Sequence, residues 1–144
     1  VNGGFIKLQL LIDGVCKPDG FLASESRVLT FLQCVPNNIG MTAISEPKVH
    51  RYSGSNPLDW GLSGFVLIAE SHISVHTFPH RSYVNIDIFS CKTFDSDSVL
   101  TDIKAHFQLH KVNFWVVARG LENYDPQLAI PRLAEARFSN ARDH

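Results

Sequence analysis

The chain has 144 residues, of which 44% are hydrophobic and 19% are charged, an ordinary composition for one compact soluble domain with a buried core. Thirteen basic and 14 acidic residues give a formal net charge of −1, so no basic excess points to nucleic acid or anionic lipid as a partner. The apolar runs are far shorter than the roughly 20 residues that a membrane-spanning helix needs, and no signal peptide is visible.

Three cysteines, Cys16, Cys34 and Cys91, form no closely spaced pair. An odd count without C-x-x-C spacing is typical of a reducing compartment, so we expect a cytoplasmic protein with neither a disulfide framework nor a structural zinc site. No internal repeat is present. We expect a single domain over residues 1–144, with a poorly ordered Arg-, Asp- and Asn-rich tail after about residue 131.

Apolar periodicity and turn residues predict six strands and two helices. Runs rich in β-branched and aromatic residues predict the strands, which are 5–12, 41–52, 63–70, 73–78, 83–89 and 112–118. Apolar residues at helical spacing predict the helices, which are 21–35, stopped by Pro36, and 96–109, capped by Ser96.

Two details indicate how these elements are arranged. Pro47 lies in the second predicted strand, and a proline inside a strand marks a sheet edge or a bulge. Val84, Ile86 and Ile88 alternate with residues of the other face, as expected of a half-buried strand. Because the order β-α-β-β-β-β-α-β groups strands together, we expect an α+β fold, a two-layer sandwich of an antiparallel-rich sheet with both helices packed on one face.

The bond between Glu70 and Ser71 lies between two apolar, β-branched runs. A serine can attack the carbonyl of the preceding residue if a strained turn between rigid strands holds its Oγ close to that carbon. A base must then take the hydroxyl proton, and a donor must stabilise the oxyanion as the amide becomes an ester. Loss of the Ser71 α-proton would break the ester and leave dehydroalanine, which hydrolyses to a pyruvoyl group.

Other residues could converge on this bond. His76 is a candidate for the base, and Ser63 for a hydroxyl that supports the tetrahedral intermediate. Cys91 ends a strand that could return beside the turn. Spacing by itself is weak evidence for this chemistry, because a Glu-Ser pair between two strands is usually just a turn.

The run from Gly61 to Pro79, GLSGFVLIAESHISVHTFP, resembles the signature of the small prokaryotic S-adenosylmethionine decarboxylases. Cys91 stands at the distance from Ser71 at which that family has its catalytic cysteine. The segment His50-Arg51-Tyr52 is similar to a His-Arg-aromatic segment of the family. A weaker likeness extends from about residue 5 to about residue 118.

The resemblance implies a proenzyme that cleaves itself between Glu70 and Ser71. The products would be a β chain, 1–70, and an α chain, 71–144, that begins with a pyruvoyl group derived from Ser71. The pyruvoyl ketone would form a Schiff base with the substrate's α-amine and act as the electron sink for the carbanion left by CO2.

The resemblance also implies residue roles and a pathway. Ser63 and His76 would act in processing, and Cys91 would be the acid that protonates the product carbon. The implied reaction is decarboxylation of S-adenosylmethionine for spermidine synthesis, a part of polyamine biosynthesis. We expect a homodimer with its active sites near the interface, acting on a small amino-acid-type substrate without nucleic acid or membrane.

Some positions depart from the family pattern. The family has a glutamate after the Thr-x-Pro step that holds the ribose hydroxyls, whereas this chain has His80, and an imidazole lacks a carboxylate's paired acceptors. Ser82 and Lys92 replace glycines. Tyr52 could stack on adenine, although the family lacks the insertion 53–60. Two alternatives therefore stay open: a pyruvoyl-dependent decarboxylase of arginine or ornithine, and an unprocessed, non-catalytic homologue that acts as a partner or regulator.

His72, His76 and His80 recur every four residues and raise the question of a metal site. The segment is predicted as a strand, in which four residues span about 13 Å, too far for one ion to bridge. We therefore expect no metal. Asp87 either points into the site or faces solvent, and the sequence does not decide between the two.

Overall fold

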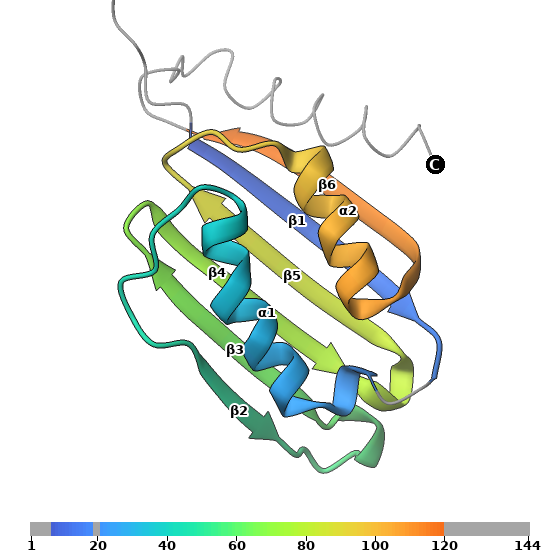
Figure 1. Cartoon of the computed structure of the whole chain (residues 1–144). Coiled ribbons are helices and arrows are strands. Elements are labelled where there is room, and N and C mark those ends of the chain that lie inside the picture. Colours follow the sequence, from blue (N-terminus) through green and yellow to red (C-terminus); the bar gives the residue numbers. More distant parts are fainter. Residues whose placement is uncertain (1–6, 19–20, 120–144) are drawn as a thin grey trace, which may run out of the picture.

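The computed structural model describes residues 7–18 and 21–119. In these ranges, six strands form one antiparallel sheet in the order β2-β3-β4-β5-β1-β6, and two helices cover one face of it (Figure 1). The strands are β1 (Lys7–Cys16), β2 (Lys48–Tyr52), β3 (Gly61–Ile68), β4 (Ser71–Phe78), β5 (Tyr83–Ser90) and β6 (Leu109–Arg119), and the helices are α1 (Glu25–Asn38) and α2 (Ser96–Phe107). The expected α+β two-layer sandwich is confirmed. The expected tail after residue 131 lies outside the described residues.

The first strand continues past the turn that was expected to close it. Asp13 and Gly14 pair with Asn85 and Val84 of β5, and the pairing with β6 also continues. Because β1 lies between two partner strands, its hydrogen bonds hold these turn-forming residues in the strand, which ends at Cys16. The prediction that β1 ends at Asp13-Gly14 was therefore wrong.

The helix ends also differ from the prediction. The first helix begins after Ser24, whose Oγ accepts a hydrogen bond from the N–H of Arg27, and it runs through Pro36 to Asn38. Proline has a helical φ, so the helix can continue for two residues beyond it, and what is lost is the N–H that would bond to the Leu32 carbonyl in the turn before. The cap of α2 is Asp95, which accepts bonds from the N–H groups of residues 97 and 98, and not Ser96 as expected.

The second predicted strand is shorter than expected. Of 41–52, the part Lys48–Tyr52 forms β2, while Ala43 makes an isolated bridge to Ile68. Pro47 comes directly before β2, which lies at the edge of the sheet, as the proline indicated.

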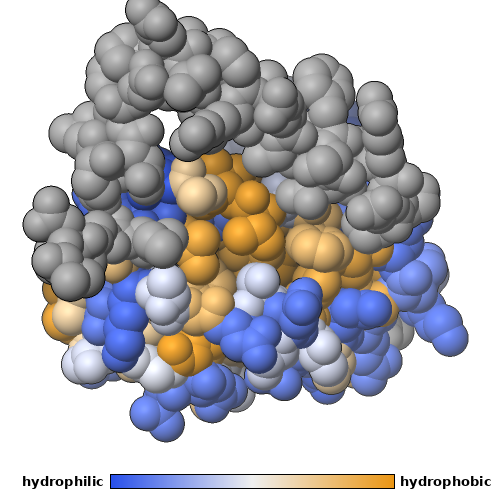
Figure 2. All heavy atoms as spheres, turned by 90° about the horizontal axis from the view of Figure 1, so that it is seen from above, coloured by the Kyte–Doolittle hydropathy of each residue, from blue (hydrophilic) through white to orange (hydrophobic). Residues whose placement is uncertain are grey.

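The core lies between the sheet and the two helices. Val84, Ile86 and Ile88 face the helices and are at most 2% exposed, so the predicted alternation of β5 is confirmed. Figure 2 shows hydrophobic residues in a central band, bordered on one side by hydrophilic ones. Neither described helix covers the opposite face of the sheet, which we call the open face. Residues on the open face include Asp13, Tyr52, Ser63, Phe65, Leu67, His76 and Asn85.

Ser82 lies in the left-handed region, with φ 53° and ψ 36°, at the end of the short helix Pro79–Arg81. A side chain there is strained, and glycine is not. We expect Ser82→Gly to raise the free energy of unfolding by about 1 kcal/mol, measured by chemical denaturation. Ser98→Gly in the first turn of α2 is the control and should lower it by about 0.5 kcal/mol. A loss of stability in Ser82→Gly would contradict this reading of the turn.

Candidate active site

The bond between Glu70 and Ser71 lies at a tight hairpin. Ile68 pairs with Ser71, so Ala69 and Glu70 form a two-residue turn and Ser71 is the first residue of β4. The strands were predicted to end at Glu70 and to resume at Ile73. In the structure β3 ends at Ile68 and β4 begins at Ser71, because these two residues pair with each other and leave Ala69 and Glu70 as the turn. Neither turn residue has a positive φ, so the expected strain is not visible in the backbone angles.

The end of β5 returns beside this turn. Ser71 pairs with Ser90, which places Cys91 next to the hairpin. The N–H of Cys91 donates to the carbonyl oxygen of Glu70 over 2.9 Å. The Ser71 Oγ lies 4.0 Å from the Cys91 Sγ. The structure therefore brings together the serine, the thiol and an N–H donor at the carbonyl that the serine would attack, and such a donor can stabilise an oxyanion.

A second pair of predicted site residues meets elsewhere on the same hairpin. Ser63 pairs with His76 across β3 and β4, and the Ser63 Oγ lies 2.9 Å from the His76 Nδ1. His76 is five strand residues from Ser71, a separation of about 16 Å at 3.3 Å per residue. Within one chain, the Ser63–His76 pair and the Ser71–Cys91 pair therefore do not form a single site.

A row of polar residues crosses the open face through this pair. In register order its members are His50, Ser63, His76, Asn85, Asp13 and Asn113. The Asn85 Nδ2 donates to Asp13 over 2.6 Å and to the Tyr83 hydroxyl over 3.2 Å. Burial raises the pKa of Tyr83, and the charge of Asp13 raises it further. The middle of the open face is thus polar and internally bonded.

The predicted substrate-binding residues, His80 and Tyr52, have contacts of their own. The ring of His80 contacts that of Trp60 with centroids 5.8 Å apart, and the guanidinium of Arg51 lies 4.1 Å from the centre of the Trp60 ring. Trp60 ends the insertion that separated this chain from the family pattern. Tyr52 is 59% exposed on β2, and its ring lies beside Gly54.

The remaining candidates have separate partners. The ring of His72 packs on Phe89 with centroids 5.7 Å apart, so the three histidines spaced by four contact three different groups. In the described part of the chain, no group of three His, Cys, Asp or Glu residues is arranged to hold a metal ion. Asp87 accepts two hydrogen bonds from the Gln9 side chain, at 3.0 and 3.1 Å.

Three residues around the cleavage turn had no role assigned from the sequence, and of these only Lys92 was named there, as a departure from the family pattern. Thr42 accepts a hydrogen bond from the N–H of Ala69 over 2.8 Å, and its own N–H lies 3.5 Å from the Glu70 carboxylate. Buried Ser90 accepts from the N–H of Lys92 over 2.9 Å. Nothing in the sequence indicated that Thr42 contacts the cleavage turn, because it is 28 residues away from Glu70 in a segment without a motif. Lys92 carried a signal, since it replaces a family glycine.

The fold is an antiparallel sheet with both helices on one face, and its candidate site is a Glu-Ser hairpin beside a cysteine. This combination is the one expected of a proenzyme of the decarboxylase class. The family pattern described as S-adenosylmethionine decarboxylase matches residues 8–120. The chain therefore belongs to the S-adenosylmethionine decarboxylase family, as the signature around Ser71 predicted.

Individual relatives agree with this assignment. The S-adenosylmethionine decarboxylase proenzyme of Clostridium botulinum (strain Langeland) is 43% identical over 61 residues, which are 42% of this chain and 53% of the relative. That of Pyrococcus horikoshii is 36% identical over 66 residues, which are 45% of this chain and 48% of the relative. The chain thus spans about half the length of the curated relatives it matches.

A solved structure extends the likeness over most of the fold. The crystal structure of the adenosylmethionine decarboxylase from Aquifex aeolicus VF5 matches with a TM-score of 0.60 and 25% identity. The match covers 82% of this chain and 93% of that chain.

Proposed function

We propose that the chain is a self-processing, pyruvoyl-dependent decarboxylase that converts S-adenosylmethionine to its decarboxylated form for spermidine synthesis. The observation that carries this proposal is the hydrogen bond of 2.9 Å from the Cys91 N–H to the Glu70 carbonyl, directly beside Ser71. Family membership and relatives named as proenzymes support it further.

The proposed cleavage uses only groups of the protein and water. The Ser71 Oγ bonds to the Glu70 carbonyl carbon, the C–N bond breaks, and the hydroxyl proton ends on the freed amine. The Cys91 N–H stabilises the negative oxygen during this shift. The ester then loses the Ser71 α-proton and releases the Glu70 carboxylate. The resulting dehydroalanine rearranges to an imine, and water converts the imine to the pyruvoyl group with loss of ammonia.

The residues around position 71 fit a pyruvoyl group formed there. Such a group supplies an electron sink for the carbanion that remains when a bound amino acid loses CO2. Cys91 would protonate that carbon, since its Sγ lies 4.0 Å from the Ser71 Oγ and a thiol can act as a general acid. Its half-buried position limits the access of water.

We further propose that the active protein is a homodimer in which each site combines residues of both copies. The two pairs of site residues are about 16 Å apart along β4, so one chain does not assemble all four. Phe65 and Leu67 are 42% and 43% exposed on the open face, beside Ser63 and His76. Packing two such faces together in a two-fold pair would bury these side chains and place the Ser63–His76 pair of one copy against the other.

Complementation tests the shared site. Ser71→Ala and His76→Ala chains should each stay uncut when expressed separately. When they are co-expressed, the His76→Ala chain should be cleaved, because a mixed pair joins its intact Ser71 to the intact His76 of the other chain. Intact mass spectrometry identifies which chain is cut.

A chain that carries both substitutions provides the matched control. It can pair with the His76→Ala chain but supplies no histidine, so this mixture should stay uncut. Cleavage of the His76→Ala chain when it is expressed separately would contradict the shared site, and so would its failure to be cut in the complementing mixture.

The leading substrate is S-adenosylmethionine, and arginine or ornithine is the alternative. The alternative is favoured by the contact of His80 with Trp60, because an imidazole in that contact offers no carboxylate to a ribose diol. Incubation with each substrate and cyanoborohydride, followed by intact mass spectrometry, tests the choice. An adduct of decarboxylated S-adenosylmethionine on the fragment that begins at position 71 supports the first substrate. An adduct formed with arginine or ornithine, and not with S-adenosylmethionine, supports the alternative.

The proposal places the reaction in the cytoplasm. Cys34 and Cys91 are free thiols, which persist in a reducing compartment. No helix in the described ranges is long and apolar enough to cross a membrane.

A further inference from the structure

A segment between α1 and β2 holds the residues that precede the scissile bond. Residues 40–45 run along the β3–β4 hairpin, although they are far from it in the sequence. Four contacts join them to it: Ala69 N–H to Thr42 O at 2.8 Å, Ile44 N–H to Leu67 O at 2.9 Å, Leu67 N–H to Ser45 Oγ at 3.1 Å, and Thr42 N–H to Glu70 Oε2 at 3.5 Å. The segment therefore contacts both the main chain and the side chain on the Glu70 side of the bond.

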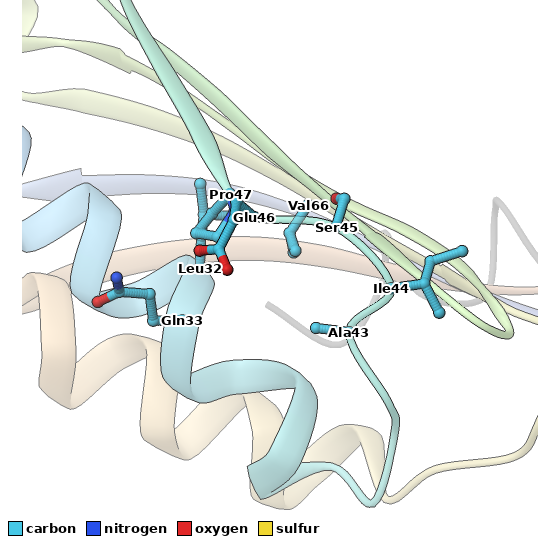
Figure 3. A pocket seen from close by; sticks show the side chains of 8 residues that line it. All are labelled: Leu32, Gln33, Ala43, Ile44, Ser45, Glu46, Pro47 and Val66. Atoms are coloured by element: carbon cyan, nitrogen blue, oxygen red, sulfur yellow. The ribbon is translucent and has the colours of Figure 1, made fainter.

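From Ala43 onward, the opposite side of this segment borders a hollow. A hollow of about 550 Å³ lies between α1 and residues 43–47, lined by Leu32 and Gln33 of the helix and by Val66 of β3 (Figure 3). The Ile44 side chain points away from this hollow and is 64% exposed. The start of the segment is held at the end of α1 by the buried Met41 side chain and by hydrogen bonds from the Gly40 and Met41 N–H groups to the carbonyls of Asn37 and Pro36. Beyond Met41, hydrogen bonds to the hairpin position the segment.

Lys92 supplies one of those bonds from the other side of the cleavage turn. Its Nζ donates to the carbonyl of Gly40 over 3.0 Å, at the start of the segment. Its own N–H is held by the Oγ of Ser90, which is fully buried and opposite Ser71. The preceding residue, Cys91, donates to the Glu70 carbonyl. Two consecutive residues thus hold the scissile carbonyl and the segment that contacts Glu70.

We infer that Lys92 is a positioning residue for self-cleavage, an inference that rests on the proposed function. By holding Gly40, its ammonium group fixes the segment 40–45, which in turn fixes Glu70 relative to the Ser71 hydroxyl. An attack within one chain depends steeply on this distance, and a misplacement of about 1 Å can cost on the order of 100-fold in rate.

The test measures how fast newly made chains cleave themselves. Wild type, Lys92→Met and Lys92→Arg are made by cell-free translation, and samples taken over time are analysed for the two fragments. Lys92→Met keeps the length of the side chain and removes its charge and donors, whereas Lys92→Arg keeps both. Lys104→Met, an exposed lysine on α2, is the matched control. A second set in the uncleavable Ser71→Ala background gives the thermal midpoint of each variant, so folding is measured separately from cleavage.

We expect Lys92→Met to cleave at least about tenfold more slowly than wild type, with Lys92→Arg within about threefold of it and midpoints within about 3 °C. Cleavage of Lys92→Met within threefold of wild type would overturn the inference, and so would equal slowing in Lys92→Arg or in Lys104→Met. A Lys92→Met chain that does not fold in the Ser71→Ala background would also overturn it, because the residue would then be structural. Cleavage of the wild-type chain tests the proposed function, whereas the ratio of the Lys92→Met cleavage rate to the wild-type rate tests the positioning role of Lys92.

Discussion

Replacing Ser71 with alanine is expected to leave the chain uncut and to abolish decarboxylation. The variant keeps the hairpin and the hydrogen bond from the Cys91 N–H to the Glu70 carbonyl, since both are made by the main chain. It lacks the hydroxyl that would attack that carbonyl, so neither the ester nor the pyruvoyl group can form. Activity should fall by on the order of 10⁶-fold, the scale observed when a nucleophile that acts as a unit with its partners is removed.

Ser74→Ala is the matched control for this experiment. Ser74 lies on the same strand, β4, and pairs with Asp87 away from the cleavage turn. It should cleave and decarboxylate at the wild-type rate, and circular dichroism should show both variants folded. Cleavage of the Ser71→Ala chain between positions 70 and 71 would contradict the proposed role of the Ser71 hydroxyl.

Replacing Cys91 with alanine should separate cleavage from decarboxylation. The main-chain N–H that donates to the Glu70 carbonyl is still present in alanine, so we expect the chain to cut itself into two fragments. The thiol beside Ser71 is lost, and with it the proposed proton donor to the product carbon. A general acid contributes about 10²–10⁴-fold, so kcat should fall by this factor, with product protonated at the wrong atom.

Cys34→Ala controls for the loss of a thiol, since Cys34 is an exposed cysteine on α1. It should behave as wild type in cleavage and in decarboxylation. Steady-state rates are measured on the cleaved fraction of each variant, so that incomplete processing does not lower the apparent kcat. Full activity of the cleaved Cys91→Ala protein would show that another group donates the proton.

The sequence predicted the elements best where local pattern and tertiary packing agree. The alternation of Val84, Ile86 and Ile88 predicted both the strand and its buried face, because the same residues form the core. Gly14 and Pro36 both gave wrong boundaries, the first because tertiary pairing overrides a local stop signal and the second because of its place in the helix. Two flanking strands hold Gly14 in β1, and Pro36 comes in the last turn of α1, where little of the helix remains.

The candidate site was predictable in part from the motif. The resemblance to the family signature pointed to Ser71 and Cys91, two residues that the structure brings within 4.0 Å. The separation of His76 from Ser71 was also implicit in the sequence, because five residues of strand span about 16 Å. Thr42 could not be predicted, since its contact with Ala69 depends on how the link between α1 and β2 crosses the hairpin. The contact between His80 and Trp60 likewise depends on the path of the insertion.

The most direct test of self-processing is the intact mass of the purified protein under denaturing conditions. We expect two polypeptides, one ending at Glu70 and one beginning at position 71. The second should be lighter by one ammonia than the product of simple hydrolysis, because a pyruvoyl group has replaced the serine. A single uncut chain would contradict self-processing and favour an unprocessed homologue that acts as a partner or regulator.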